Sequence, residues 1–351
     1  MARIHAAQAI HDALHVAMAA DPSVLCYGLG VDDPKRIFGT TAGLQERFGA
    51  ARVFDMPTAE NAMTGIGIGA ALGGMRPVMC HQRLDFFLLA MDQLVNNAAK
   101  WRYTFGEGHK VPLTLRLIVG RGWGQGPTHS QNLQAWFAHV PGLKVVMPAT
   151  AADAKGLLLS AIFDDDPVVF LEHRWVHSAQ GEVADGDVRV PIGQAATLRE
   201  GDAVTIVAMS YLVAEASHAC RALAQAGVHC ELIDLRTIKP LDMTTIRASV
   251  ARTGRLLVLD SGFATGSVAA EIIARISMDH WSLLRAAPQR LAAPDCPEPT
   301  SYGLTRQFYT EAADIVRCVG RMLGLTTLPL DALPPARTHH DVPGDWFTGP
   351  F

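Results

Sequence analysis

The sequence predicts an α/β protein with two domains, each a mostly parallel sheet flanked by helices. Three observations support this prediction. Short apolar runs alternate with amphipathic helical patterns along most of the chain, as expected of repeated βαβ units. The run Leu-Thr-Leu-Arg-Leu-Ile-Val at 113–119 is almost continuously apolar, which is typical of a strand covered by helices on both faces. A length of 351 residues is sufficient for two domains of ordinary size.

The first domain is expected over residues 1–175, where strand and helix patterns follow each other regularly. An amphipathic pattern predicts a helix at 4–20, and a short apolar run predicts a strand at 24–28. Residues 29–50 are expected to be loop and helix. Further strands are expected at 53–54, 77–80, 113–119, 144–147 and 168–171, and further helices after Pro57 and at 84–103, 132–139 and 151–163.

This alternation stops at 176–202, which we expect to be a linker with short β-like pieces. A second domain is expected at 203–325. Its strands are predicted from Ala203, Cys230 and Leu256 onward, and its helices at 214–226 and 267–276. Residues 326–351 lack the periodicity of a core element, so they predict an irregular tail that covers a surface or a partner.

Composition excludes several functional classes. The formal net charge is −4 and the Lys and Arg residues form no basic stripe, so nucleic-acid binding is not expected. No apolar run approaches the ~20 residues of a membrane span, and the first residues contain no secretory core segment. The six cysteines form no C-x-x-C pair, which predicts free thiols in a cytoplasmic protein.

The segment from Asp55 to Gly74 contains the first candidate catalytic group. Pro57 ends a strand, Thr58 is expected to cap the following helix, and Glu60 falls in its first turn. Three glycines spaced four residues apart give this helix a face without side chains, which predicts close packing against another element. They are Gly65, Gly69 and Gly73. We therefore expect the Glu60 carboxylate to be partly buried and able to take part in proton transfer.

Two other interpretations of this segment compete with a catalytic acid. Glu60 can be a solvated residue that the helix dipole favours in the first turn. Residues 65–70 also match the dinucleotide-binding pattern G-x-G-x-x-A. These glycines lie inside the helix and not at the strand–helix turn where a pyrophosphate binds, so we treat the match as accidental.

Two later strands are also followed by side chains that can do chemistry. The segment His-Gln-Arg-Leu-Asp-Phe at 81–86 follows one strand, and a loop with four glycines at 120–126 leads to His129 after the next. Ligands of parallel sheets bind at the carboxyl ends of strands, so both segments are site candidates. The alternatives are a structural turn at His129, core packing for Phe86 and surface positions for the basic residues. No hydrolase, zinc-protease or phosphate-loop motif occurs.

Several segments, taken together and in order, resemble one family. They are Thr58-Ala-Glu-Asn, 65–77, 92–100, His129-Ser-Gln, 136–146, 153–157, 234–237 and 294–297. The family is the β subunit of the decarboxylating component of 2-oxoacid dehydrogenases (pyruvate, branched-chain and acetoin type), within the transketolase-like thiamine diphosphate enzymes. The resemblance implies a pyrimidine-binding first domain and a transketolase C-terminal-like second domain.

The resemblance also implies a coenzyme and the residues that bind it. Thiamine diphosphate lies between two chains, with its aminopyrimidine ring on the β subunit and its diphosphate and Mg2+ on the α subunit. Glu60 hydrogen-bonds the ring nitrogen, Phe86 packs on the pyrimidine, and Gln82 and Thr58 line its pocket. His129 faces the substrate as a proton donor or an orienting group. The implied catalytic residues are therefore Glu60 and His129.

A K+ site is implied in the turn that follows the helix at 151–163. Ala161, Ile162, Asp164 and Asp166 match positions at which mainly backbone oxygens bind a structural potassium ion.

A missing motif predicts a partner. Family members that hold the diphosphate carry Gly-Asp-Gly followed by an Asn pair, but here no Gly-Asp-Gly precedes Asn96-Asn97. The chain therefore carries half of a site, and we expect it to be inactive without an α subunit. The expected assembly is an α2β2 heterotetramer with the glycine face at a subunit contact. A lipoyl acyltransferase is a further partner that the resemblance allows.

The pocket segment departs from the pyruvate-type pattern. His81 and Arg83 make it more polar, and Thr58 replaces a larger aliphatic residue. We therefore expect a roomier, cationic pocket in which His81 and Arg83 contact a polar or anionic substrate. The predicted function is decarboxylation of a 2-oxoacid with transfer of the resulting acyl unit. The alternative is a two-chain carboligase or split transketolase-like enzyme with a sugar or polar aldehyde acceptor. A nucleotide-binding oxidoreductase and an inactive scaffold subunit are the hypotheses from other classes.

Overall fold

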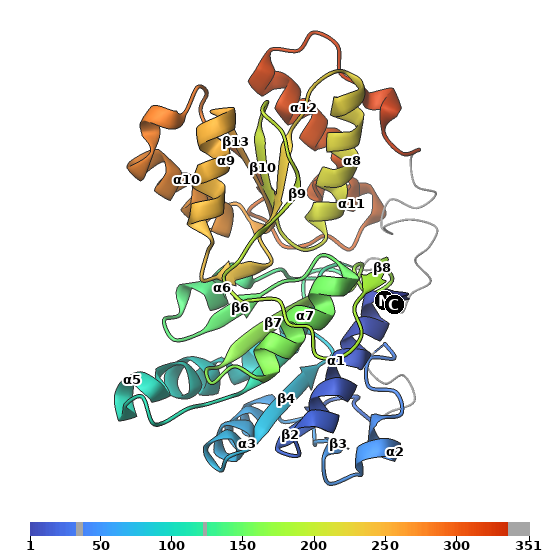
Figure 1. Cartoon of the computed structure of the whole chain (residues 1–351), viewed down its shortest axis with the longest axis vertical. Helices are drawn as coiled ribbons and strands as arrows, with labels where there is room; N and C mark the ends of the chain where they lie inside the picture. Colours follow the sequence, from blue (N-terminus) through green and yellow to red (C-terminus); the bar gives the residue numbers. More distant parts are fainter. Residues whose placement is uncertain (33–37, 122–124, 336–351) are drawn as a thin grey trace.

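The computed structural model describes residues 1–32, 38–121 and 125–335, which form two sheets with helices on both faces of each (Figure 1). This confirms the predicted α/β class. The larger sheet occupies the lower half of Figure 1, and the smaller sheet occupies the upper half. Among the helices of these residues, none is long and apolar enough to cross a bilayer.

The first sheet has seven strands in the order β12-β6-β7-β5-β4-β2-β3. Its strands are β2 (Val24–Gly28), β3 (Val53–Asp55), β4 (Arg76–His81), β5 (Thr114–Val119), β6 (Lys144–Val146), β7 (Val168–His173) and β12 (Thr237–Lys239). All neighbouring pairs are parallel except β12 with β6. The apolar runs thus became strands as predicted, and β5 is buried along its whole length.

Two layers of helix cover this sheet. Helices α1 (Ala6–Ala20) and α7 (Ala151–Ile162) pack side by side on one face. Helices α3 (Glu60–Leu72), α4 (Leu84–Phe87) and α6 (Gln134–His139) cover the other face. The short helix α2 (Leu44–Phe48) precedes β3. Both faces are therefore dry, which explains the lack of polar alternation in the central strands.

The second sheet has five strands in the order β14-β13-β10-β11-β9. They are β9 (Ala196–Arg199), β10 (Thr205–Ala208), β11 (Glu231–Asp234), β13 (Leu256–Phe263) and β14 (Gln289–Ala293). Helices α8 (Leu212–Gln225) and α12 (Ala312–Leu323) pack on one face, and α9 (Met243–Thr253) and α10 (Val268–Asp279) on the other. The short helix α11 (Tyr302–Phe308) precedes α12.

Three strands connect the expected linker and the two sheets. β8 (Gln180–Val183) and β9 lie within the expected linker, and β12 lies after it. β8 pairs antiparallel with β1 (Ala2–His5), and β9 pairs antiparallel with β11. The strand β12, which follows β11, returns to the edge of the first sheet. The domain limits at 175, 202 and 325 stay a prediction. In the expected tail, a 3-10 turn at Leu330–Ala332 is followed by residues 336–351, which lie outside the described residues.

Two predicted helices differ from the structure. The helix expected at 4–20 begins at Ala6, because residues 2–5 are drawn into pairing with β8. The helix expected at 84–103 is broken into α4, a 3-10 turn at Leu88–Ala90, a π-helical turn at Gln93–Asn97, a 3-10 turn at Ala98–Lys100 and α5 (Trp101–Phe105). Asn97 donates to Gln93 and Asn96 donates to Asp92 across this turn. Side-chain bonds between residues four apart are compatible with a helix, so they do not explain the widened middle turn.

The helix that carries Glu60 also differs from its prediction. Its N-cap is Ala59, which makes no side-chain capping bond, and Thr58 is exposed, so the predicted Thr58 cap is wrong. Ala59 itself has a non-helical backbone, with φ −153° and ψ 71°, and the helix begins at the next residue. Tight packing of the glycine face is also wrong within the chain, since Gly69 and Gly73 are exposed.

The glycine that requires close packing is Gly67 on the opposite face of α3. A methyl group at Gly67 would overlap the hydroxyl of Tyr27, which donates a hydrogen bond of 3.1 Å to the Met63 carbonyl. This contact ties α3 to β2. Gly67 is not one of the three glycines predicted to pack closely. The face of α3 that packs inward is determined by its contact with the sheet, and the spacing of the glycines does not reveal it.

We expect Gly67→Ala to lower the free energy of unfolding by about 1–3 kcal/mol, since the added carbon forces Tyr27 to move. The matched control is Gly69→Ala, whose added carbon would meet nothing within 4 Å. That control should stabilise the purified chain by up to about 1 kcal/mol through helix propensity. Denaturant unfolding of both variants tests the contact, and equal midpoints would contradict it.

Candidate active site

The predicted site residues leave the same edge of the first sheet. Strands β3, β4, β5 and β7 are held parallel, directly or through β2, so their carboxyl ends lie together. Glu60 follows β3, the segment 81–86 follows β4, and the glycine-rich loop follows β5. Residues 122–124 of that loop lie outside the described residues. Polar groups at this edge are placed where ligands of parallel sheets bind.

Glu60 is the first residue of α3 and is nearly buried, with 7% of its surface exposed. Its carbonyl accepts a hydrogen bond from Thr64, but across the described ranges its carboxylate has no hydrogen bond or ion pair. The helix packs against α4, which carries Phe86. A covered carboxylate without a partner in its own chain is costly, so its burial indicates a ligand or another chain.

Phe86, His129 and Arg83 are in direct contact. The rings of Phe86 and His129 meet edge to face with centroids 5.3 Å apart. Thr128 Oγ1 lies 2.9 Å from His129 Nδ1, and Arg83 Nη1 donates to the His129 carbonyl at 3.0 Å. The loop therefore presents His129 beside the aromatic ring, with a guanidinium fixed directly behind it.

Three other predicted residues form no hydrogen bond or ring contact with this group within the described ranges. The His81 ring is buried in the core edge-on to Phe87, and neither ring nitrogen has a hydrogen-bond partner among the described residues. Burial lowers the pKa of His81 to about 4, so the ring is neutral. Gln82 and Thr58 are exposed, and within the described part of the chain their side chains make no hydrogen bond. The geometry therefore gives no support to a substrate contact by His81.

Sequence analysis missed Gln125 and Arg174. Arg83 Nη2 and Arg174 Nη1 each donate to Gln125 Oε1 at 2.5 Å, so one amide oxygen joins the loops after β4, β5 and β7. Arg174 is the first residue after the buried strand β7. A charged residue directly after an apolar strand was a usable signal for this position.

The second domain adds Glu298 to the site, which sequence analysis also missed. Only 3% of Glu298 is exposed, and burial, followed by the nearby negative charge of Asp85, raises its carboxyl pKa to about 7. Asp85 itself accepts a hydrogen bond of 2.8 Å from the Gln131 amide. A methyl group at Gly126 would overlap Thr300, so the segment around Glu298 packs directly on the glycine-rich loop.

Comparison with known proteins identifies the family. The transketolase pyrimidine-binding domain matches residues 2–176, and the transketolase C-terminal domain matches residues 193–315. The chain is 41% identical to the pyruvate dehydrogenase E1 component subunit beta-1, mitochondrial, of Oryza sativa subsp. japonica, over 90% of this chain and 85% of that protein. It is 39% identical to the acetoin:2,6-dichlorophenolindophenol oxidoreductase subunit beta of Cupriavidus necator, over 88% of this chain and 94% of that protein.

The chain belongs to the E1 β-subunit family of thiamine-diphosphate-dependent 2-oxoacid dehydrogenases. A pyruvate dehydrogenase E1 component subunit beta of Rickettsia bellii is 36% identical over 90% of this chain and 97% of its own length. The solved structure titled "Split gene transketolase, inactive beta4 tetramer" is 22% identical, with a TM-score of 0.75, and covers 92% of this chain and 99% of its own. This last similarity concerns the fold alone.

The turn expected to bind K+ in this E1 β subunit carries its own cations. Lys144 Nζ lies 2.7 Å from both carboxylate oxygens of Asp164. Arg76 Nη1 donates to the carbonyls of Ile162 (3.3 Å) and Asp164 (2.9 Å), and Arg102 Nε donates to Asp166 at 2.5 Å. Ala161 lies at the end of α7, where its carbonyl accepts the Asp164 amide. These contacts leave the turn poorly suited to a further positive ion.

No metal site is evident from side chains. In residues 1–32, 38–121 and 125–335, no three His, Cys, Asp or Glu side chains are grouped closely enough to hold a metal ion. The family implies thiamine diphosphate, but these residues alone identify no site for its divalent cation.

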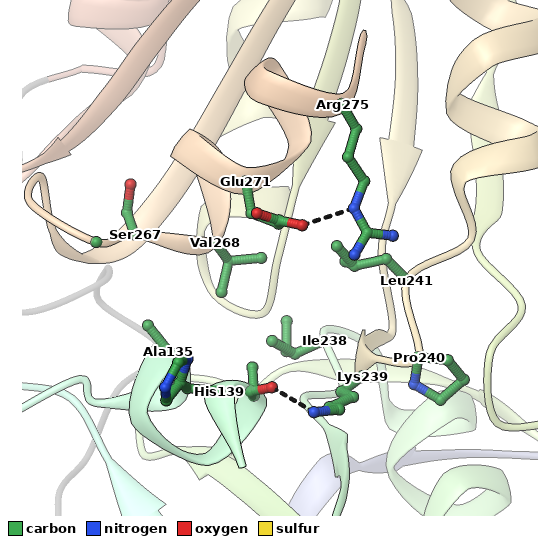
Figure 2. A pocket seen from close by; sticks show the side chains of 12 residues that line it. Ala135, His139, Ile238, Lys239, Pro240, Leu241, Ser267, Val268, Glu271 and Arg275 are labelled. Carbon is green, nitrogen blue, oxygen red and sulfur yellow. Dashed lines mark hydrogen bonds and ion pairs between the residues drawn. The ribbon is translucent and has the colours of Figure 1, made fainter. Parts of the chain in front are cut away.

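A cavity of about 450 Å³ lies away from the predicted residues, between α6 and the start of α10 (Figure 2). Its wall includes His139, Lys239 and Glu271. The polar heads are already satisfied, because Lys239 donates to two carbonyls of the α6 region and Arg275 pairs with Glu271. These contacts leave neither Lys239 nor Glu271 unpaired for a ligand.

We expect Glu298→Gln to stabilise the protein at pH 8 but not at pH 5. The folded pKa of about 7 exceeds the ordinary value near 4.5, so the folded state binds the proton more tightly. Stability from this group is complete below pH 4.5 and is lost as the pH rises through 7. Replacement by a neutral amide removes this loss, which is worth up to about 3 kcal/mol. Melting temperatures from pH 5 to 8 test this, with the exposed Glu182→Gln as control; parallel curves would refute it.

Proposed function

We propose that the chain acts in an α2β2 enzyme that decarboxylates a 2-oxoacid and transfers the resulting acyl unit. Activity requires an α subunit that holds the diphosphate and Mg2+. The observation that carries this proposal is the nearly buried Glu60 carboxylate, which has no partner in the described chain and lies at the sheet edge shared with Phe86 and His129. The pyrimidine ring of thiamine diphosphate, the coenzyme of the family, would be the hydrogen-bond partner that the Glu60 carboxylate lacks.

The residues fit the pyrimidine half of thiamine diphosphate. Glu60 offers a carboxylate oxygen to a ring nitrogen, and in a site with little water it can hold or release the proton there. Phe86 offers an aromatic surface that is half-buried and already oriented by His129. Gln82 is exposed between the end of β4 and Arg83, so its side chain is available to line the pocket for the ring. Thr58 precedes Glu60 by two residues and is also exposed.

The chemistry is then divided between coenzyme and chain. When bound, thiamine diphosphate supplies the carbon nucleophile that adds to the keto carbon and takes up the electron pair released with CO2. The chain's own residues set proton positions. Glu60 controls the proton on the pyrimidine nitrogen, and His129 donates to or orients the substrate oxygen. Mg2+ is assigned to the partner, and no K+ is assigned to the turn that Lys144, Arg76 and Arg102 already contact.

The outer face of α3 is the proposed contact with the α subunit. It exposes Ile66 and Leu72 together with Gly69 and Gly73. Apolar side chains beside glycines allow another helix to approach closely, and exposed apolar area of this kind marks an interface. A lipoyl acyltransferase partner and a cytoplasmic location stay predictions from the sequence.

A second candidate function is favoured by one observation. Arg83 places a buried cation directly behind His129, which suits a polar acceptor such as a sugar aldehyde in a carboligase or transketolase-like reaction. Assay of the α-containing complex with a lipoyl domain and with sugar aldehydes as acceptors separates the two functions. Turnover with sugar aldehydes alone would replace the first proposal by the second.

We expect Glu60→Gln to lower turnover of the reconstituted complex by at least about 100-fold, because the amide cannot exchange the proton. The α partner is the protein that co-purifies with the chain and carries the Gly-Asp-Gly motif. Assembly, measured by size-exclusion chromatography with light scattering, should be unchanged, as for the exposed Glu182→Gln control. Full activity of the Glu60→Gln variant, or loss of assembly with it, would contradict the proposal.

We expect Gly69→Leu to weaken association with the α subunit by at least tenfold, or about 1.4 kcal/mol, because the side chain blocks close approach. The control is Gly303→Leu, at an exposed glycine of the separate helix α11. Sedimentation or calorimetric titration of each variant with the partner measures the difference. Equal affinity for both variants would remove α3 from the interface.

A further inference from the structure

Two buried guanidinium groups meet at one amide oxygen. Arg83 and Arg174 are 7% and 2% exposed, and both donate to Gln125 Oε1 at 2.5 Å. An amide oxygen carries only a partial charge, so it does not neutralise two cations. The arrangement thus holds two like charges close together, away from water.

Most of the hydrogen-bonding capacity of Arg174 is unused. Its Nε and Nη2 are buried and have no hydrogen-bond partner within the described ranges. Its guanidinium carbon lies 5.7 Å from the centre of the Phe38 ring, which is an apolar neighbour. Burial and then repulsion by Arg83 lower the pKa of Arg174 to about 9. The group is still charged at neutral pH, so its unsatisfied donors face a real desolvation cost.

The acidic groups nearby do not cancel this charge. Asp85 raises the pKa of both arginines, but its carboxylate forms no ion pair with either of them within the described ranges; it accepts a hydrogen bond from Gln131 instead. Glu298 is about half protonated at neutral pH, because its pKa is raised to about 7. The pair is therefore short of negative charge. The missing partner is an oxyanion such as a carboxylate or phosphate, which a guanidinium group binds through two parallel hydrogen bonds.

We propose that Arg83 and Arg174 bind a second anionic group, a carboxylate or phosphate, at the end of the substrate remote from the reacting carbon. This proposal rests on the proposed function, because it takes the His129 side of the sheet edge as the reaction centre. Arg83 connects the two regions, since its other nitrogen donates to the His129 carbonyl.

The carboxylate that leaves as CO2 is a poor occupant for this pair. Its charge disappears in the transition state, so two guanidinium groups would stabilise the ground state more and slow the reaction. A charge elsewhere on the substrate is unchanged by the reaction, so its binding stabilises the ground state and the transition state equally. The anion belongs either to the 2-oxoacid or to the acceptor, and both carry the same recognition chemistry.

The activity test uses the reconstituted holoenzyme with two pairs of substrates. One pair is a 2-oxoacid with a distal carboxylate and one with an apolar side chain of similar length. The other pair is an aldehyde phosphate and the corresponding neutral aldehyde as acceptor. Arg174→Met should lower kcat/KM for the anionic member of one pair at least about 30-fold and leave its neutral counterpart within about threefold. The affected pair identifies whether donor or acceptor carries the anion.

The binding test does not depend on activity. Melting of the complex is measured with glutarate, with inorganic phosphate and with butyramide as the uncharged control. We expect glutarate or phosphate to raise the Tm of the wild type and of Arg317→Met, an exposed control, but not that of Arg174→Met. Without ligand, Arg174→Met should melt higher than the wild type, because it removes a buried charge with unused donors.

The outcomes separate the two proposals. If the complex turns over no 2-oxoacid and no aldehyde acceptor, the proposed function fails, while the binding test still decides the anion site. If it turns over neutral substrates as well as anionic ones, and Arg174→Met affects both equally, the proposed function stands and the anion site is refuted. Equal melting shifts in wild type and Arg174→Met would also refute it.

Discussion

A buried ion pair joins two of the strands whose ends carry the site, β5 and β7. Arg116 lies in β5, paired with Cys80 of β4 and Phe170 of β7, and its guanidinium binds Glu172 of β7 at 2.6 and 3.0 Å. Burial alone would raise the pKa of Glu172, but the Arg116 charge and a hydrogen bond from His177 lower it to about 2. Loss of one partner of such a pair costs about 3–5 kcal/mol, because the other charge stays buried.

Strand β7 is followed directly by a second buried charge, that of Arg174, which has no ion-pair partner among the described residues. Glu172 points into the layer beneath α1 and α7, where Arg116 neutralises it. Two residues later, Arg174 leaves the strand and, among the described side chains, hydrogen-bonds only the neutral Gln125 amide. The fold thus contains a compensated charge inside the sheet and an uncompensated one at its edge. Glu172 and Arg174 are both buried, so they differ in whether a counterion is present and not in exposure. Glu172 therefore has a structural role, whereas the charge of Arg174 is available to a ligand.

The sequence predicted what local pattern determines. The strands around 24–28 and 114–119 were predicted because short, almost continuously apolar runs are typical of buried strands. Phe86 and His129 were predicted as site candidates in separate segments, and the structure shows their rings in contact. The helix at 84–103 was misjudged because its turn at Gln93–Asn97 is π-helical and is followed by a 3-10 turn, a difference that a helical sequence pattern does not reveal. Arg174 was missed because its partner is 49 residues away and its role depends on which strands are neighbours. Strand order is a property of the whole sheet that no local pattern encodes.

Helix α3 combines these local and long-range requirements in one element. Its inner face is fixed by Gly67 against Tyr27, while its outer face around Gly69 is open. Glu60 begins the helix, so its position depends on how the helix is held. Within the described residues only the inner face has a packing partner. A subunit on the outer face would hold the helix from both sides and thereby fix the carboxylate more closely. If the site is divided between two chains as proposed, the position of the Glu60 carboxylate depends on assembly as well.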